Sequence, residues 1–249
     1  MIMCESDRMS QASHVYRSWL GDEGRALAAT LDGDPTTQVP SCPGWSLTDL
    51  VAHVGSYHRW AADLLHDASP QPRAPYSLTP DPDVPLAEWY LASLELLLKA
   101  IDTTDPDTPM WTVTIDQKAS AWCRRQAHDL TVHRWDAQNA YGSAHPIHAD
   151  RAADFIDELF EAALPYILPF LGRPVPEVSL ALRSVDGTYR RRIDGTTGQP
   201  HLSHDPTPAD ATLTGTPSDL LLALWRRTNA TTLTGDPAAL TAWQQAIDG

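Results

Sequence analysis

Residues 121–142 read AWCRRQAHDLTVHRWDAQNAYG, and they predict one long helix with an unusual number of ionisable groups. Asp129 and His133 are four residues apart in this stretch. On a helix they therefore project from one face, offset by about 40°. A carboxylate and an imidazole one turn apart can bind a single metal ion. The D-x-x-x-H spacing is common by chance, so this interpretation depends on what the rest of the chain places beside it.

A second helix is predicted directly after the segment VPSCPGW at residues 39–45, where Ser46 and Asp49 form a capping pattern. An apolar stripe at spacings of three and four residues runs along it through Leu50, Tyr57, Trp60 and Leu64. His53 lies on this stripe, whereas His58 lies on a side that we expect to be exposed. A single histidine on such a face is most often a core side chain bonded to a carbonyl or carboxylate group.

Further helices are predicted at about residues 12–31, 86–101 and 149–168, the last kinked or ended by Pro165. We expect the helix at 86–101 to supply core through Leu91, Leu94, Leu98 and Ile101. The Pro-rich segment 69–85 is either a lid or binding rim or a solvated connection. Together these segments predict a bundle of four or five antiparallel helices.

Bundles build metal sites from side chains on facing helices, and His53 lies on one predicted helix while Asp129 and His133 lie on another. Two imidazoles and one carboxylate are a usual catalytic zinc set that leaves a fourth position open. The same ligands suit non-haem Fe(II), so they do not identify the metal.

After Pro174 the pattern changes to short alternating runs that are typical of strands, with a helix at DLLLALWRRT and another at AALTAWQQAI. We therefore predict an all-helical domain at residues 1–170 and a small α+β domain at residues 171–249. The fold class is α plus α+β.

The composition excludes several kinds of partner. A net charge of −14 and a pI near 4.9 argue against binding to nucleic acid or to anionic membrane surfaces. No apolar run is long enough to span a bilayer, and the first residues lack the apolar region of a signal peptide. Cys4, Cys42 and Cys123 form no spaced disulfide framework, so we expect a soluble protein of the cytoplasm.

Two segments in this order, VPSCPGWSLTDLVAH at 39–53 and RRQAHDLTVHRWDA at 124–137, resemble the mycothiol-dependent maleylpyruvate isomerase family. The segment ADATLTGTPSDLLLALWRR at 209–227 resembles the C-terminal domain of that family. The resemblance implies a DinB-like metal-binding bundle followed by a sterol-carrier-like α+β domain. It also implies Zn²⁺ or another divalent metal, and mycothiol as the thiol cosubstrate.

By this resemblance, the first metal ligand of the family falls on His53 and the last on His133. Its middle ligand is a glutamate in a His-Glu-x-x-x-His pattern, and Asp129 holds that place here. Aspartate reaches about 1.5 Å less far, so the helices pack closer, a water intervenes or the metal binds more weakly. His128 is no ready substitute, because it stands about 140° from His133 around the helix.

The activity implied by the resemblance is isomerisation of a maleylpyruvate-like unsaturated diacid through reversible thiol addition. Arg227 matches the arginine that the family presents from its C-terminal domain, and Arg226 stands where members commonly have glycine. Arg125 is a second candidate partner for the anionic substrate, and either arginine could instead form a surface ion pair. Asp136 could orient a ligand imidazole or be a surface acid. Cys42 could be a nucleophile, but its CPGW context favours a packed turn.

Two other functions remain open. The chain could transfer mycothiol to another electrophile, in detoxification or natural-product biosynthesis, or it could be a non-catalytic protein that binds a small ligand. Metal content separates the binding protein from the enzymes, and product analysis with mycothiol and maleylpyruvate separates isomerase from transferase. The sequence does not predict an oligomeric state.

Overall fold

The computed structural model describes residues 5–248, with side chains from residue 13 onward. The chain divides into two compact units. The helical unit runs through Thr112 and continues at Asp116–His145, and the sheet unit comprises Val113–Ile115 and the chain from Pro146. This division falls earlier than the boundary predicted after residue 170, because the helical segment after Pro146 packs with the C-terminal sheet unit.

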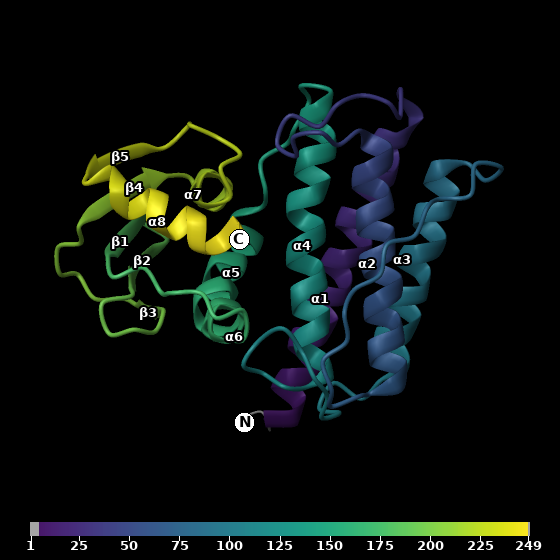
Figure 1. Ribbon diagram of the computed structural model, residues 1–249, viewed down its shortest axis with the longest axis horizontal. Coiled ribbons are helices and arrows are strands. Elements are labelled where there is room, and N and C mark those ends of the chain that lie inside the picture. Colours follow the sequence, from purple (N-terminus) through teal and green to yellow (C-terminus); the bar gives the residue numbers. More distant parts are fainter. Residues whose placement is uncertain (1–4, 249) are drawn as a thin grey trace. The chain divides into compact units, whose positions relative to one another are not determined.

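Four long helices form the helical unit (Figure 1): α1 (Glu5–Ala28), α2 (Leu47–Asp67), α3 (Leu86–Thr103) and α4 (Ala119–Ala140). A short 3-10 turn, η1 (Ala29–Asp32), follows α1. Helix α1 packs against α3 and α4, and α2 packs against the same two helices. Fully buried large side chains of this unit are Leu20, Leu27, Leu47, Leu50, Trp60, Leu64, Tyr90, Leu97 and Trp122.

The directions of the helices decide which residues meet. Helix α2 runs antiparallel to α4, so His53 near the start of α2 meets His133 near the end of α4. Helices α2 and α3 run parallel, because Gly55 lies against Trp89 and Arg59 donates to Ser93 one turn farther along both helices. The predicted antiparallel bundle therefore contains parallel neighbours as well.

The Pro-rich segment at residues 69–85 makes this parallel pair possible, because it returns the chain along α2. Tyr76 donates a hydrogen bond to Asp63, and the backbone N–H of Leu78 donates to Ser56 Oγ. The segment is thus a connection packed on α2.

One local prediction in the helices is confirmed and one is corrected. Ser46 and Asp49 form a capping box at the start of α2. The core face of α3 is shifted from the predicted stripe, because Leu91 is 40% exposed while Leu94 and Leu97 are buried. None of the described helices is long and apolar enough to cross a membrane.

The sheet unit contains five strands in the order β3-β2-β1-β4-β5. They are β1 (Ser179–Ser184), β2 (Arg190–Asp194), β3 (His201–Ser203), β4 (Ala211–Gly215) and β5 (Thr232–Gly235). Strands β1 and β4 are parallel, whereas the other neighbours are antiparallel. The short alternating runs after Pro174 are therefore confirmed as strands of a sheet, whose shortest strand, β3, has three residues.

Helices α5 (Ala149–Glu158), α6 (Leu164–Phe170), α7 (Pro217–Leu224) and α8 (Pro237–Asp248) complete the sheet unit. A π-helical turn, η2 (Leu159–Ala163), separates α5 from α6 directly before Pro165. Proline lacks the N–H that an α-helix would use there, so the hydrogen-bond pattern changes before Pro165, but the chain stays helical to Phe170 and does not end at this proline.

Candidate metal centre

The structure brings together three donors that the sequence analysis singled out. A nitrogen of His53, an oxygen of Asp129 and a nitrogen of His133 all lie within 4.8 Å of one another. Asp129 Oδ1 is 3.9 Å from His133 Nε2, and the His53 and His133 rings meet edge to face at a centroid distance of 5.1 Å. Helix α4 supplies the carboxylate and one imidazole from adjacent turns, and the antiparallel helix α2 supplies the other imidazole.

The surroundings of the two imidazoles shift their pKa values in opposite directions. Burial lowers the pKa of His133, but the Asp129 charge and hydrogen bonds with Asp136 and Cys42 outweigh this effect and raise it to about 10. Burial lowers the pKa of His53, and Asp129 opposes only part of that effect. His53 is an exposed residue. The neighbouring ring of Trp45, 5.0 Å away between centroids, nevertheless removes water from it.

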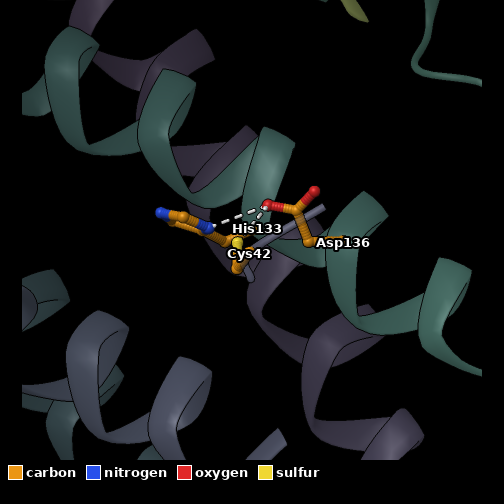
Figure 2. A group of neighbouring side chains, drawn as sticks. All are labelled: Cys42, His133 and Asp136. Atoms are coloured by element: carbon orange, nitrogen blue, oxygen red, sulfur yellow. Dashed lines mark hydrogen bonds and ion pairs between the residues drawn. The ribbon is translucent and has the colours of Figure 1, made fainter. Parts of the chain in front are cut away.

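A buried carboxylate lies beside Nδ1 of the His133 ring (Figure 2). Asp136 Oδ2 lies 3.1 Å from His133 Nδ1, and the Asp136 side chain is completely buried. Figure 2 shows the other ring nitrogen of His133 pointing away from Asp136. Of the two possibilities that the sequence left for Asp136, a surface acid is therefore wrong.

The donor set fits a divalent cation. Oδ2 of Asp129 is buried and has no hydrogen-bond partner among the described residues, which is costly for a carboxylate unless a cation balances it. Donor atoms in a tetrahedral zinc site lie about 3.4 Å apart, since each bond is about 2.1 Å long. The observed spacing is somewhat wider, as the short Asp129 side chain predicts.

Two other histidines of these helices lie outside the cluster. His128 is buried against Tyr16 of α1, with ring centroids 6.0 Å apart, so it faces away from His133 as predicted. The prediction that His58 is exposed is wrong. It is fully buried, and its Nδ1 lies 2.8 Å from Gln126 Oε1. Burial lowers its pKa to about 4.

The candidate substrate-binding arginines lie in different units. Arg125 is buried on α4, one turn before Asp129. Arg227 follows α7 in the sheet unit, where it donates to the Trp225 carbonyl oxygen and stacks on the Trp225 ring. Arg226, next to it, has a φ of 56°, in the region that favours glycine. The glycine that the family resemblance led us to expect at this position would fit this backbone conformation.

Ser41 is a residue near this centre that sequence reasoning missed, and Cys42 was considered there only as a nucleophile or as part of a packed turn. Both contact Asp136, from a segment far from α4 in the sequence. The only signal was their place in the segment VPSCPGW, which sequence analysis treated as a packed turn.

Models of known protein families match both units of the chain. The family model described as the mycothiol maleylpyruvate isomerase N-terminal domain matches residues 19–138, and the model described as the MDMPI C-terminal domain matches residues 150–242. The chain belongs to this family. Its members are thiol-dependent isomerases by name, and the two matches fall on either side of the boundary between the helical and sheet units.

Two solved structures of this family have a similar fold. Both are crystal structures of the mycothiol-dependent maleylpyruvate isomerase, one of them a histidine-to-alanine mutant. They match with TM-scores of 0.60 and 0.61 at 14% sequence identity, and the match covers 89% of this chain and 92% of theirs. At this identity the likeness concerns the fold. No curated protein sequence matches the chain significantly.

Proposed function

We propose that this chain is a metal- and mycothiol-dependent isomerase that acts on a maleylpyruvate-like unsaturated diacid. The observation that carries the proposal is the convergence of His53, Asp129 and His133 within 4.8 Å, in a chain that belongs to the mycothiol maleylpyruvate isomerase family. These three residues would hold Zn²⁺ or another divalent ion. Cys42 and Cys123 are not joined in a disulfide, which supports a reducing compartment such as the cytoplasm.

When bound, a divalent ion supplies one thing to this chemistry: it keeps a coordinating thiol deprotonated near neutral pH. The sulfur of mycothiol then adds to the conjugated double bond, and the displaced electron pair moves to the carbonyl oxygen of the substrate. Rotation about the new single bond and the reverse elimination give the trans acid and return the thiolate. No atom is gained or lost, so the reaction needs no oxidant or reductant.

The residues of the chain orient the donors for this step. Asp136 accepts a hydrogen bond from Nδ1 of His133, and Nε2 of the same ring therefore faces Asp129. His53 is neutral at pH 7, because its pKa is lowered, and its lone pair is therefore available. The carboxylate of Asp129 offsets part of the charge of the cation.

The diacid substrate needs a cationic partner, and Arg227 is our first candidate. Its guanidinium is restrained by the Trp225 carbonyl oxygen and ring, so less side-chain freedom is lost on binding a carboxylate. Arg125 is the second candidate, because it lies one turn from Asp129 on α4.

One observation favours a second function. Asp129 replaces the glutamate expected from the family pattern, and a looser centre could serve mycothiol transfer to a different electrophile. The products separate the two functions. An isomerase converts maleylpyruvate to its trans isomer with mycothiol regenerated, whereas a transferase leaves a stable thioether and consumes mycothiol.

The first experiment is elemental analysis of the purified protein, with the variants Asp129→Ala and His53→Ala. We expect about one metal ion per chain in the wild type and little in either variant. His66→Ala is the matched control, because His66 is an exposed histidine of the same helix as His53 but lies outside the donor cluster. No metal in the wild type after incubation with excess zinc would contradict the proposed centre.

The second experiment is the reaction of the metal-loaded protein with maleylpyruvate, with and without mycothiol, followed by chromatography of the acids. We expect the trans acid only when mycothiol is present, with the mycothiol concentration unchanged at the end. A loaded protein that forms only a thioether with other electrophiles would support the transferase instead.

A further inference from the structure

The turn that precedes α2 contacts the surroundings of both histidines. Ser41 Oγ donates a hydrogen bond to Asp136 Oδ1 at 2.6 Å, and Cys42 Sγ donates to Asp136 Oδ2 at 3.7 Å. Trp45, at the end of the same turn, packs its ring on His53 with centroids 5.0 Å apart. One short segment therefore contacts the carboxylate behind one imidazole and the face of the other imidazole.

Pro43 and Gly44 favour the backbone conformation of this turn, and backbone hydrogen bonds close it. The N–H of Trp45 donates to the Cys42 carbonyl oxygen at 3.0 Å across Pro43 and Gly44. Gly44 has a φ of 86°, as the third position of a type II turn requires. The N–H of Val39 donates in turn to the Trp45 carbonyl oxygen at 2.9 Å. These bonds limit the positions that the side chains of the turn can take.

Asp136 is completely buried, so its charge requires hydrogen-bond donors. Ser41 and Cys42 supply two of them from the turn, and His133 Nδ1, 3.1 Å from Oδ2, supplies another from α4 itself. Ligand histidines usually donate their second ring N–H to a carboxylate or carbonyl group, which fixes the tautomer and the ring plane. Here that arrangement directs Nε2 toward Asp129, which lies 3.9 Å away.

We propose that Asp136 is a positioning residue for His133, and that the turn at residues 39–45 orients both imidazoles of the centre. The inference rests on the proposed function, since orientation matters only if the imidazoles bind a metal ion. It assigns a role to Cys42 as well: the thiol, whose sulfur lies within 4.8 Å of donor atoms of His133 and Asp136, donates a hydrogen bond to the positioning carboxylate.

The experiment compares the cobalt affinity of wild type, Asp136→Asn and Ser41→Ala by competition with a chromophoric chelator. Loss of the carboxylate charge is expected to weaken binding by about 10- to 100-fold, as loss of such outer partners usually does. Ser41→Ala keeps the carboxylate and removes one donor, so its loss is smaller, about 3- to 10-fold. Should Asp136→Asn fail to fold, Ser41→Ala decides the result.

Thr48→Ala is the matched control. Thr48 Oγ1 donates to the Pro35 carbonyl oxygen at 3.1 Å, so this variant removes another hydrogen bond between the same connection and α2. We expect it to keep wild-type cobalt affinity. Equal losses in Thr48→Ala and Ser41→Ala would mean that the turn supports the fold only, and would overturn the inference.

A spectroscopic readout separates positioning from general stability. In the zinc-loaded wild type, ¹⁵N spectra of the imidazoles should show a protonated, hydrogen-bonded Nδ1 and a metal-bound Nε2 for His133. Asp136→Asn should change the Nδ1 signal. Cys42→Ser keeps a donor and should retain metal affinity, whereas Cys42→Ala should lose part of it.

Two results would overturn this inference alone: cobalt affinity that is equal in wild type, Asp136→Asn and Ser41→Ala, or a sulfur-to-cobalt charge-transfer band that disappears in Cys42→Ser. The second result would make Cys42 a ligand. Failure of the wild type itself to bind metal would instead overturn the proposed function, so the two failures are distinguishable.

Discussion

His53 of α2 and His133 of α4 lie edge to face at a ring-centroid distance of 5.1 Å, yet their pKa values shift in opposite directions. His133 is flanked by the Asp129 and Asp136 carboxylates, which stabilise its charged form. His53 lies among the rings of Trp45, Tyr57 and His133, and the effect of burial on its pKa outweighs that of the Asp129 charge. At neutral pH the pair therefore carries one positive charge, on His133, and this predicts how metal binding depends on pH.

Zinc binding should release about one proton per ion at pH 7 to 8, because His133, with a pKa raised to about 10, must lose a proton to become a ligand. Affinity should therefore rise with pH up to about pH 10. Isothermal titration in two buffers with different ionisation enthalpies measures the proton count. A binding enthalpy independent of the buffer would contradict the prediction.

Lengthening the carboxylate should tighten the centre. Asp129→Glu restores the residue of the family pattern and adds about 1.5 Å of reach toward a cation between the two histidines. We expect a gain of about 10-fold in zinc affinity, and for Asp129→Ala a loss of more than about 100-fold, beyond the usual effect of an outer partner. Chelator competition measures both, and weaker binding by the glutamate variant would be evidence that the helices have repacked around aspartate.

His58 should make the fold sensitive to acid. Burial lowers its pKa to about 4, below the ordinary histidine value of about 6.5, so the unfolded chain binds more protons between these two pH values. Stability is therefore complete above pH 6.5 and falls toward pH 4, by an amount on the order of 3 kcal/mol. Urea unfolding at several pH values should show a shallower acid dependence in His58→Gln, and an unchanged one in His66→Gln, a control at an exposed site.

Arg226→Gly should stabilise the protein. The φ of 56° at Arg226 costs an ordinary residue about 1 kcal/mol more than glycine. The variant loses an exposed ion pair to Asp248, 3.0 Å long, but such pairs contribute little. We expect the free energy of unfolding to rise by about 0.5–1 kcal/mol, measured by denaturant titration. Arg226→Ala loses the ion pair and keeps the strain, so a similar gain in that variant would rule out strain as the cause.

Arg227 should affect substrate binding and leave the metal in place. A charge-assisted hydrogen bond to a carboxylate contributes about 1.5–3 kcal/mol, so Arg227→Ala should raise KM for the diacid by about 10- to 100-fold with unchanged metal content. Steady-state kinetics with elemental analysis of the same sample tests this. Arg226→Ala is the neighbouring control, and an equal KM in wild type and Arg227→Ala would leave Arg125 as the candidate.

Much of the fold could be predicted from short stretches of the chain, because helix periodicity, caps and turns depend on neighbouring residues. The Ser46–Asp49 capping box and the Pro43–Gly44 turn are examples. The spacing of Asp129 and His133 is equally local, since one helix fixes it.

Only the tertiary structure decided what lies across from these residues. His58 is buried, and its Nδ1 lies within hydrogen-bond distance of Gln126 Oε1 on α4. The periodicity of α2 alone could not predict this partner. The position of α5 and α6 in the sheet unit also depends on packing between distant segments. The sequence by itself determined which helices carry the carboxylate and the imidazoles. The fold alone decided that Ser41 and Cys42 meet Asp136, because a contact between residues distant in the chain depends on how the helices pack and run.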